Sequence, residues 1–172
     1  MKLALLVLFF TTGFQSAIAA QSVNAIDGVA MDGFDVVAYF KIGEPRKGSP
    51  EYSLQYKDQT WQFSSPGNLA DFKASPEIYE PKFNGWCAFA VSEGYSADVD
   101  FIDGWSILDG KLYLNWNAST RDQFLKEQKV RKNLADQRWP VVESGLKAGW
   151  LKVHRHSDYP QIGIKHPQQL EN

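Results

Sequence analysis

Two strand–turn–strand patterns constrain the fold of this chain more than any other feature of its sequence. In the first, residues 52–56 alternate between apolar and polar side chains, residues 57–59 form a turn, and the alternation resumes at residues 61–63. In the second, the largely apolar residues 105–108 and 111–116 flank Asp109-Gly110. A period of two is typical of a half-buried strand, and Asp-Gly between apolar runs favours a tight hairpin turn. The sequence therefore predicts two antiparallel hairpins.

Helix signals lie between the two hairpins and after the second one. Ser65-Pro66 combines an N-cap residue with a proline at the first helical position, and Ser75-Pro76 ends that helix and opens another short turn. From Asn117 the pattern indicates helix that ends near Gly149. Because proline lacks the amide hydrogen that a helix interior needs, Pro140 predicts at least two helical pieces here.

Two further segments complete the expected architecture. Residues 35–41, DVVAYFK, are β-branched and aromatic and predict a strand. Residues 86–91, WCAFAV, are too short for periodicity to separate a buried helix from a strand. Hairpins followed by helices indicate the α+β class, here a small antiparallel sheet built from hairpins, covered by short helices, with a C-terminal helical segment.

The first twenty residues have the layout of a signal peptide. Lys2 supplies a positive start, residues 3–10 are an unbroken apolar run, and the small residues Ala17, Ala19 and Ala20 follow. The apolar run is much shorter than the roughly 20 residues that a membrane span needs. We expect cleavage after Ala19 or Ala20 and export to the periplasm or outside the cell. We find no second long apolar stretch in the sequence, so we expect no membrane span.

Length and charge restrict the rest of the chain. We expect one domain over residues 21–150 and a flexible tail over residues 151–172, because the tail holds few large apolar residues. The net charge is −2. This charge offers no basic surface for nucleic acid and no polybasic patch for a membrane.

Thiol and imidazole groups are scarce. Cys87 is the only cysteine, and its apolar neighbours favour a buried, inert thiol over a redox-sensitive thiol or a soft-metal ligand. All three histidines, His154, His156 and His166, lie in the expected tail. His154 and His156 are spaced to bind a metal weakly, although such a pair on a tail is more often solvated. The metal candidates are therefore Cys87, His154 and His156.

Aromatic residues crowd the N-terminal half of the expected domain. Large rings either fill a small core or line a pocket for an apolar or planar ligand such as haem, and composition does not separate the two. The candidate ligand-binding residues are Cys87, Tyr39, Trp61, Trp86 and Phe89.

Two groups of acidic residues are candidates for acid–base catalysis or for calcium binding. Asp27, Asp32 and Asp35 are candidates for paired acid–base work, although Asp-Gly turn geometry already explains the first two. The acidic cluster in residues 98–109 has the wrong register for a calcium-binding loop, so we expect a hydrated turn there.

Four segments of the chain resemble a known family. These are DGFDVVAYF at residues 32–40, the stretch over residues 52–81, GWCAFAVSEGY at residues 85–95 and KLYLNWN at residues 111–117. In order and spacing they resemble exported YHS-domain proteins over residues 30–139. The resemblance implies the fold and the export, and it places Cys87 at the cysteine of the family's G-[WY]-C-A motif.

The resemblance departs from the family at its signature and at its metal site. Tyr56 and Ser65 fit the Tyr-His-Ser signature, but Lys57 stands where the histidine is expected. In metal-associated members three cysteines correspond to Ala38, Ser64 and Asn68 of this chain. Because serine and asparagine are poor substitutes for thiolates, a zinc or copper site is not carried over.

These observations lead to one expected function and two alternatives. We expect an exported, non-enzymatic YHS-like module that binds a small ligand in an aromatic-lined pocket or assists an exported protein partner, without a cofactor. The first alternative is a protein that handles a metal ion (copper or zinc) or haem through Cys87. The second is an enzyme that uses aspartate and tyrosine residues.

Overall fold

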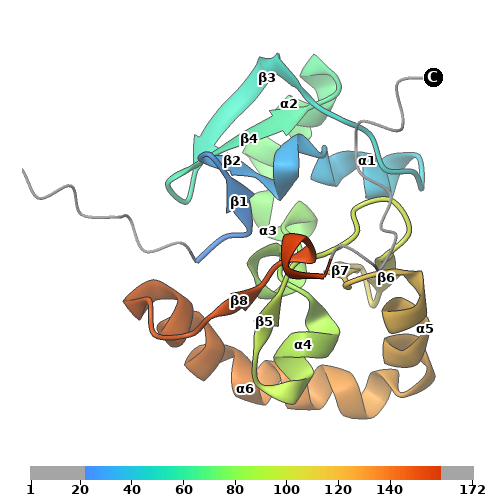
Figure 1. Cartoon of the computed structure of the whole chain (residues 1–172). Helices are drawn as coiled ribbons and strands as arrows, with labels where there is room; N and C mark the ends of the chain where they lie inside the picture. The colour runs from blue at the N-terminus through green and yellow to red at the C-terminus, as the bar shows by residue number, and fades with distance from the viewer. Residues whose placement is uncertain (1–21, 160–172) are drawn as a thin grey trace, which may run out of the picture.

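The computed structural model describes residues 22–159, and it confirms the α+β class (Figure 1). The expected signal peptide (residues 1–20) and His166 lie outside the described residues. A four-stranded sheet occupies the upper half of Figure 1, with strand order β1-β2-β4-β3. Its strands are β1 (Ala25–Ile26), β2 (Val29–Ala30), β3 (Ser49–Tyr56) and β4 (Gln59–Phe63). The helices beside it are α1 (Val36–Lys41), α2 (Pro66–Ala74) and α3 (Pro76–Tyr79).

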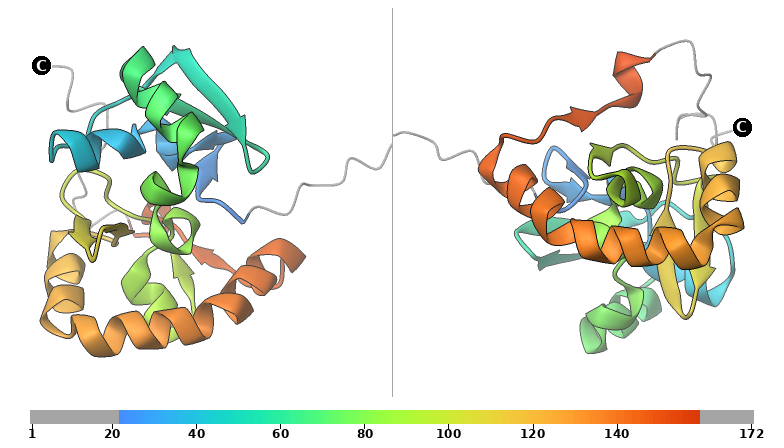
Figure 2. Two further views of the ribbon diagram at one scale, coloured as in Figure 1. Left: turned by 180° about the vertical axis from the view of Figure 1, so that it is seen from behind. Right: turned by 90° about the horizontal axis from the view of Figure 1, so that it is seen from below.

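The other half of the molecule combines longer helices with two strand pairs. Its helices are α4 (Ala88–Glu93), α5 (Ala118–Lys126) and α6 (Gln128–Ala148). Its strands are β5 (Ser96–Ala97), β6 (Trp105–Leu108), β7 (Lys111–Leu114) and β8 (Val153–His154). Short 3-10 turns are formed by Met31–Gly33, Lys82–Gly85 and His156–Asp158. Seen from behind and from below, α6 runs along this half of the molecule (Figure 2).

Both predicted hairpins are confirmed. Strands β3 and β4 pair antiparallel, and so do β6 and β7, where Leu108 faces Lys111 across the Asp109-Gly110 turn. A parallel pairing of β2 with β4 through Val29 and Thr60 extends the first hairpin, and β5 and β8 form a separate parallel pair. The sequence did not indicate the parallel pairs, because each pairing involves only one or two residues that are far apart in the chain.

The predicted strand over residues 35–41 is wrong, because this segment forms helix α1. Asp35 is its N-cap, and its carboxylate accepts hydrogen bonds from the backbone amides of Val37 (2.9 Å) and Ala38 (3.3 Å). Val36, Val37 and Tyr39 are buried in the core cluster that also contains Trp61 and Phe63. The cap and the burial together outweigh the β-propensity of the two valines, which is a weak preference.

Helix α2 begins as predicted, and the open question over residues 86–91 is settled as a helix. The Ser65 hydroxyl accepts a hydrogen bond from the Asn68 amide at 3.1 Å, with Pro66 at the first helical position. Cys87 is the N-cap of α4, which ends at Gly94 in the left-handed conformation (φ 90°). Glycine adopts that conformation without the steric penalty that a side chain brings.

The predicted break at Pro140 is wrong, because α6 continues through this residue. The C-terminal helical region instead divides at Glu127, between α5 and α6. Pro140 is exposed, while Ala135, Val142 and Leu146 on α6 are buried in a core cluster together with Ala88 and Val91 of α4. This burial offsets the single helical hydrogen bond that proline cannot donate.

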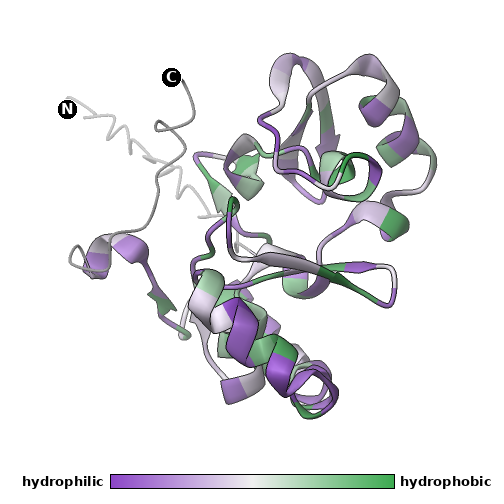
Figure 3. Ribbon diagram, turned by 90° about the vertical axis from the view of Figure 1, so that its right-hand side faces the viewer, coloured by the Kyte–Doolittle hydropathy of each residue, from purple (hydrophilic) through white to green (hydrophobic). Residues whose placement is uncertain are grey.

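Two clusters of buried side chains form the core, and the first of them reaches into both halves of the fold, because it also includes Ala90 of α4 and Leu112 and Leu114 of β7. The first lies under the four-stranded sheet and includes Phe34, Trp61, Phe63 and Phe72. The second lies between α4, α5, α6 and the β6–β7 hairpin. Hydrophobic residues accordingly occur in both halves (Figure 3). In the described part of the chain, no helix combines the length and the apolar character that a bilayer crossing requires.

Residues 151–159, the first part of the expected flexible tail, contain a short strand and a turn. Strand β8 pairs in parallel with β5, with Ser96 opposite Val153 and Ala97 opposite His154. The chain then turns at His156–Asp158. Backbone pairing and side-chain contacts hold this segment in place. Its composition did not indicate this, because it has few large apolar residues. The remainder of the expected tail lies outside the described residues.

Candidate functional site

A cavity of about 450 Å³ lies where α4, β5, α5 and the C-terminal segment meet. Four aromatic side chains form much of its wall. The residues that line it are Cys87, Phe89, Tyr95, Ala97, Trp116, Thr120, Gln123, His154 and Tyr159. None of these nine side chains is an aspartate, glutamate, lysine or arginine. The cavity therefore suits an uncharged ligand with planar apolar surface, because charged ligands need charged or strongly polar partners in a buried site.

Cys87 lies at the inner wall of this cavity. Its sulfur accepts a hydrogen bond from the Ala90 amide at 3.5 Å, and its backbone amide donates to Ala97 of β5. The residue is 1% exposed. Burial raises the pKa of the thiol from 9.0 to about 11, against smaller opposing contributions from backbone hydrogen bonds. The thiol is therefore neutral near pH 7, which makes it a weak nucleophile and a poor metal ligand until it loses its proton.

The C-terminal segment supplies the wall opposite α4. His154 Nδ1 lies 3.1 Å from the Tyr159 hydroxyl, and the His154 ring meets Tyr95 edge-on with 5.3 Å between centroids. Tyr159 also contacts the Trp116 ring edge-on at 5.8 Å. This half of the wall combines aromatic faces with hydroxyl and imidazole groups that are able to orient a polar atom of a ligand.

Phe89 is held in place from outside the cavity. The Arg131 guanidinium lies 4.1 Å from the centre of the Phe89 ring, and it is itself fixed by Glu93 and Glu127. The Phe89 backbone amide donates to the Asn115 side chain at 3.2 Å. These contacts orient one of the aromatic walls before any ligand binds, which lowers the entropy cost of binding.

The structure brings some predicted site residues together and separates others. Cys87, Phe89 and His154 line the same cavity. Tyr39, Trp61 and Trp86 lie in the core and line neither of the two cavities described here: their polar atoms donate to backbone carbonyls of Phe101 (2.7 Å), Tyr56 (2.9 Å) and Ser22 (3.0 Å). Each ring is at most 2% exposed. For these three residues the core-filling interpretation accounts for the packing.

Sequence reasoning missed several residues of the cavity wall. These are Tyr95, Trp116, Thr120, Gln123 and Tyr159. They come from separate segments, and only the overall aromatic density pointed toward them. Tyr159 in particular was assigned to a tail, so no local pattern placed it beside Trp116.

His154 and His156 face different cavities, so the predicted His-x-His pair does not converge on one point. His156 lines a second cavity of about 490 Å³, together with Asp32, Asp98 and Arg155. Its Nε2 atom lies 3.1 Å from the Trp116 carbonyl oxygen. In an extended strand, residues two positions apart point to the same side. Here the strand ends at His154 and a 3-10 turn begins at His156, so the two imidazole rings do not share a direction. Within residues 22–159, no group of three histidine, cysteine or acidic side chains is placed to hold a metal ion.

The three acidic candidates for enzyme chemistry are in different environments. Asp27 occupies a turn with φ 49° and is exposed, whereas Asp32 forms an ion pair with Lys47 at 3.0 Å. Asp35 is fully buried and accepts hydrogen bonds from the protein at both carboxylate oxygens. Its hydrogen bonds are those of a structural cap rather than of a group facing a cavity.

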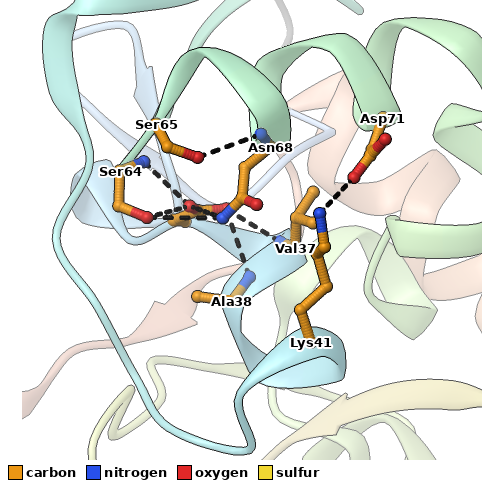
Figure 4. A network of polar contacts seen from close by, with 8 residues as sticks. Val37, Ala38, Lys41, Ser64, Ser65, Asn68 and Asp71 are labelled. Atoms are coloured by element: carbon orange, nitrogen blue, oxygen red, sulfur yellow. Dashed lines mark hydrogen bonds and ion pairs between the residues drawn. The ribbon is translucent and has the colours of Figure 1, made fainter.

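The three positions that the family resemblance aligns with cysteines meet around the Asp35 carboxylate, Ser64 and Asn68 through their side chains and Ala38 through its backbone amide. Figure 4 shows Ser64, Asn68 and the Ala38 amide converging on one point. The Ser64 hydroxyl and the Asn68 side-chain amide donate to the same oxygen of Asp35, at 2.6 and 2.7 Å. A metal ion needs lone pairs, but here these groups direct hydrogens inward. The site does not fit a thiolate-type metal centre, and Asp35 supplies the negative charge within the protein itself.

Comparisons with protein-family models, with curated proteins and with solved structures find no match for this chain.

Proposed function

We propose that this protein is an exported, non-enzymatic binding module of the YHS-like type, and that the Cys87 cavity captures a small, uncharged, planar molecule. The observation that carries the proposal is the uncharged wall of four aromatic rings around a volume of about 450 Å³. Cavities of this size hold a ligand of one to three fused or linked rings. Rings stack on Trp116 and Phe89, while the polar groups of Thr120, Gln123 and His154 orient a hydroxyl or carbonyl group.

A direct test uses N-phenyl-1-naphthylamine, a neutral planar dye whose fluorescence rises in apolar surroundings. The wild-type protein should bind it saturably at one site. Trp116→Ala removes one aromatic wall and should weaken binding about tenfold or more, since a ring contact contributes on the order of 1–2 kcal/mol. Trp150→Ala is the matched control, because Trp150 is 62% exposed and does not line the cavity.

A second variant separates loss of the site from loss of the fold. Gln123 is exposed at the cavity margin on α5, so Gln123→Trp should obstruct the cavity without removing a core side chain. Reduced dye binding with unchanged unfolding by urea supports the proposal. Non-saturable binding, or equal affinity in the wild type and both cavity variants, would overturn it.

A metal or haem role remains as a second candidate because Cys87 and His154 line the same cavity. Elemental analysis and an absorbance spectrum of natively exported protein, beside those of Cys87→Ser, test this candidate. Stoichiometric metal or a haem band that is lost in Cys87→Ser would favour it over capture of an organic ligand. A colourless and metal-free preparation from cells grown with ample metal would exclude it.

A further inference from the structure

We infer that residues 153–159 form a strap that opens and closes over the Cys87 cavity, and that Asp98 is the residue that holds the strap closed. The inference adds regulation of access to the proposed binding site. The ligand part of it rests on the proposed function, whereas the movement of the strap does not.

The strap separates the two cavities of the molecule. His154 and Tyr159 line the Cys87 cavity, while Arg155, His156 and Ser157 line the second cavity on the other side. A displacement of the strap therefore removes part of the wall of both cavities at once. A ligand in the Cys87 cavity that contacts His154 and Tyr159 therefore stabilises the closed position of the strap.

Asp98 contacts the strap with its backbone and with both of its carboxylate oxygens. Its amide donates to the His154 carbonyl at 2.9 Å, its Oδ1 atom accepts from the Arg155 guanidinium at 2.7 Å, and its Oδ2 atom accepts from the His156 amide at 3.0 Å. The Asp98 side chain is 19% exposed, so these bonds are partly shielded from water. Charge-assisted bonds in such a setting are stronger than those of a solvated ion pair.

Hydrophobic burial contributes little to holding the strap. None of residues 153–159 is fully buried, and its strand pairing with β5 spans only two residues. The other contacts of the strap include the edge-on ring contact of His156 with Trp116 at 4.0 Å, the approach of His156 Nε2 to the Trp116 carbonyl oxygen at 3.1 Å, and the Arg155 guanidinium over the Trp86 ring. Segments with few buried apolar contacts open at a lower free energy than the whole protein does.

The start of the strap is positioned for hinge motion. Helix α6 ends at Gly149, which has a positive φ of 74°, and Leu151 and Val153 pack against the second core cluster. The chain up to and including Val153, the first residue of the strap, is thus anchored, while residues 154–159 depend on Asp98. Rotation about the few residues between these points is enough to move the strap.

The test uses Cys87 as a reporter, because it is the only thiol of the chain and it is 1% exposed. Labelling of the full-length protein with 5,5′-dithiobis(2-nitrobenzoate) should be slow in the wild type. Asp98→Ala should be labelled about tenfold faster or more, since it removes two hydrogen-bonded contacts to the strap. Arg155→Ala removes one of them and should give a smaller increase. Asp71→Ala, which breaks the ion pair of Lys41 with Asp71 on the far helices, should leave the rate unchanged.

Global unfolding is distinguished from strap motion by urea. Labelling through the strap should be nearly independent of low urea concentrations, because little surface is exposed on opening. Equal labelling rates for the wild type and Asp98→Ala would overturn the inference. So would a rate in Asp98→Ala that follows global unfolding across the urea series.

The same assay separates the strap from the proposed ligand. Saturating N-phenyl-1-naphthylamine should protect Cys87 from labelling in the wild type if the dye lies in the cavity. Absence of protection together with faster labelling of Asp98→Ala would contradict the proposed function and leave the strap supported. Protection without any effect of Asp98→Ala would support the ligand site and overturn the strap.

Discussion

Asp35 and Ser64 are joined by two hydrogen bonds to a single carboxylate oxygen. The Ser64 backbone amide donates to Asp35 Oδ2 at 2.8 Å, and the Ser64 hydroxyl donates to the same atom at 2.6 Å. The Asn68 side chain adds a third bond, while Oδ1 caps helix α1. This buried carboxylate therefore connects α1, the end of β4 and the start of α2.

Replacing Asp35 should destabilise the protein strongly. Asp35→Ala removes a fully buried carboxylate that caps α1 and accepts hydrogen bonds from Ser64 and Asn68, and we expect a loss of about 3 kcal/mol or more in the free energy of unfolding. Ser64→Ala keeps the backbone bond to Asp35 and should cost about 1.5 kcal/mol. Urea unfolding at pH 7 measures both values. Similar stabilities of the two variants would show that the carboxylate does not organise this junction.

Alkaline pH should lower the free energy of unfolding, and ionisation of the Cys87 thiol should account for part of this loss. The pKa of the thiol is raised from 9.0 to about 11 in the folded state, so only the unfolded state ionises between these values. Its contribution to stability is full below pH 9 and is lost as the pH rises from 9 through 11. The loss is about 1.4 kcal/mol at pH 10, one unit above the unfolded value.

Urea unfolding of the wild type and of Cys87→Ser, each at pH 8 and pH 10, isolates this contribution. Serine does not titrate in that range, so Cys87→Ser should lose less stability than the wild type does. Burial also raises the pKa values of Tyr56 and Tyr113 to about 12, but those tyrosines are common to both proteins. Equal losses in the two proteins would mean that the thiol titrates normally in the folded state.

Substitutions in the two hairpin turns should change the stability of the protein in opposite directions. Lys57 and Asp58 have φ values of 50° and 59°, and the second turn has φ values of 52° at Asp109 and 70° at Gly110. Such turns favour glycine at the second position. We therefore expect Asp58→Gly to raise the free energy of unfolding, and Gly110→Ala to lower it, each by about 1 kcal/mol.

Thermal unfolding of the two turn variants provides the measurement. A methyl group at Gly110 would meet no atom within 4 Å, so the change there is conformational rather than steric. Shifts of the same sign in the two variants would contradict the backbone explanation.

Gly145 should resist substitution despite its position inside a helix. A Cβ atom at this residue would lie 2.8 Å from Leu151 Cβ and from the Trp150 ring, at the chain segment that leads into the strap. Alanine favours helix by about 1 kcal/mol over glycine, yet Gly145→Ala should lower stability and speed the labelling of Cys87. The exposed neighbour Ser144 provides the control, because Ser144→Ala should do neither. Unchanged stability and labelling in Gly145→Ala would show that residues 150–151 shift freely.

Local signals predicted a large part of the fold. The hairpin turn at Asp109-Gly110 and the start of α2 at Ser65-Pro66 were both confirmed, since each depends on residues only a few positions apart. Helix α1 was predicted as a strand, because the β-branched pattern was weighed without the Asp35 cap and without the burial of Val36, Val37 and Tyr39, which depends on distant parts of the chain. The helix break predicted at Pro140 was wrong for a similar reason, since the effect of this proline depends on how α6 packs against α4.

The candidate site was predicted only in part. Cys87 and Phe89 were identified, and His154 was identified for its imidazole, but Tyr95, Trp116 and Tyr159 were not. These rings come from segments that have no shared motif. Tyr39, Trp61 and Trp86 were selected by the same aromatic criterion and lie in the core, because composition does not distinguish a ring that faces a cavity from one that is enclosed.

The sequence by itself determined the α+β class, the two hairpins and the start of α2, because turn geometry, capping and alternation act between near neighbours. Only the tertiary structure decided that residues 153–159 cross between two cavities, that Asp98 holds them, and that His154 and His156 face opposite ways. Those outcomes depend on contacts between residues about forty or more positions apart. No local pattern records such contacts, because their free energy is gained only when the whole chain has folded.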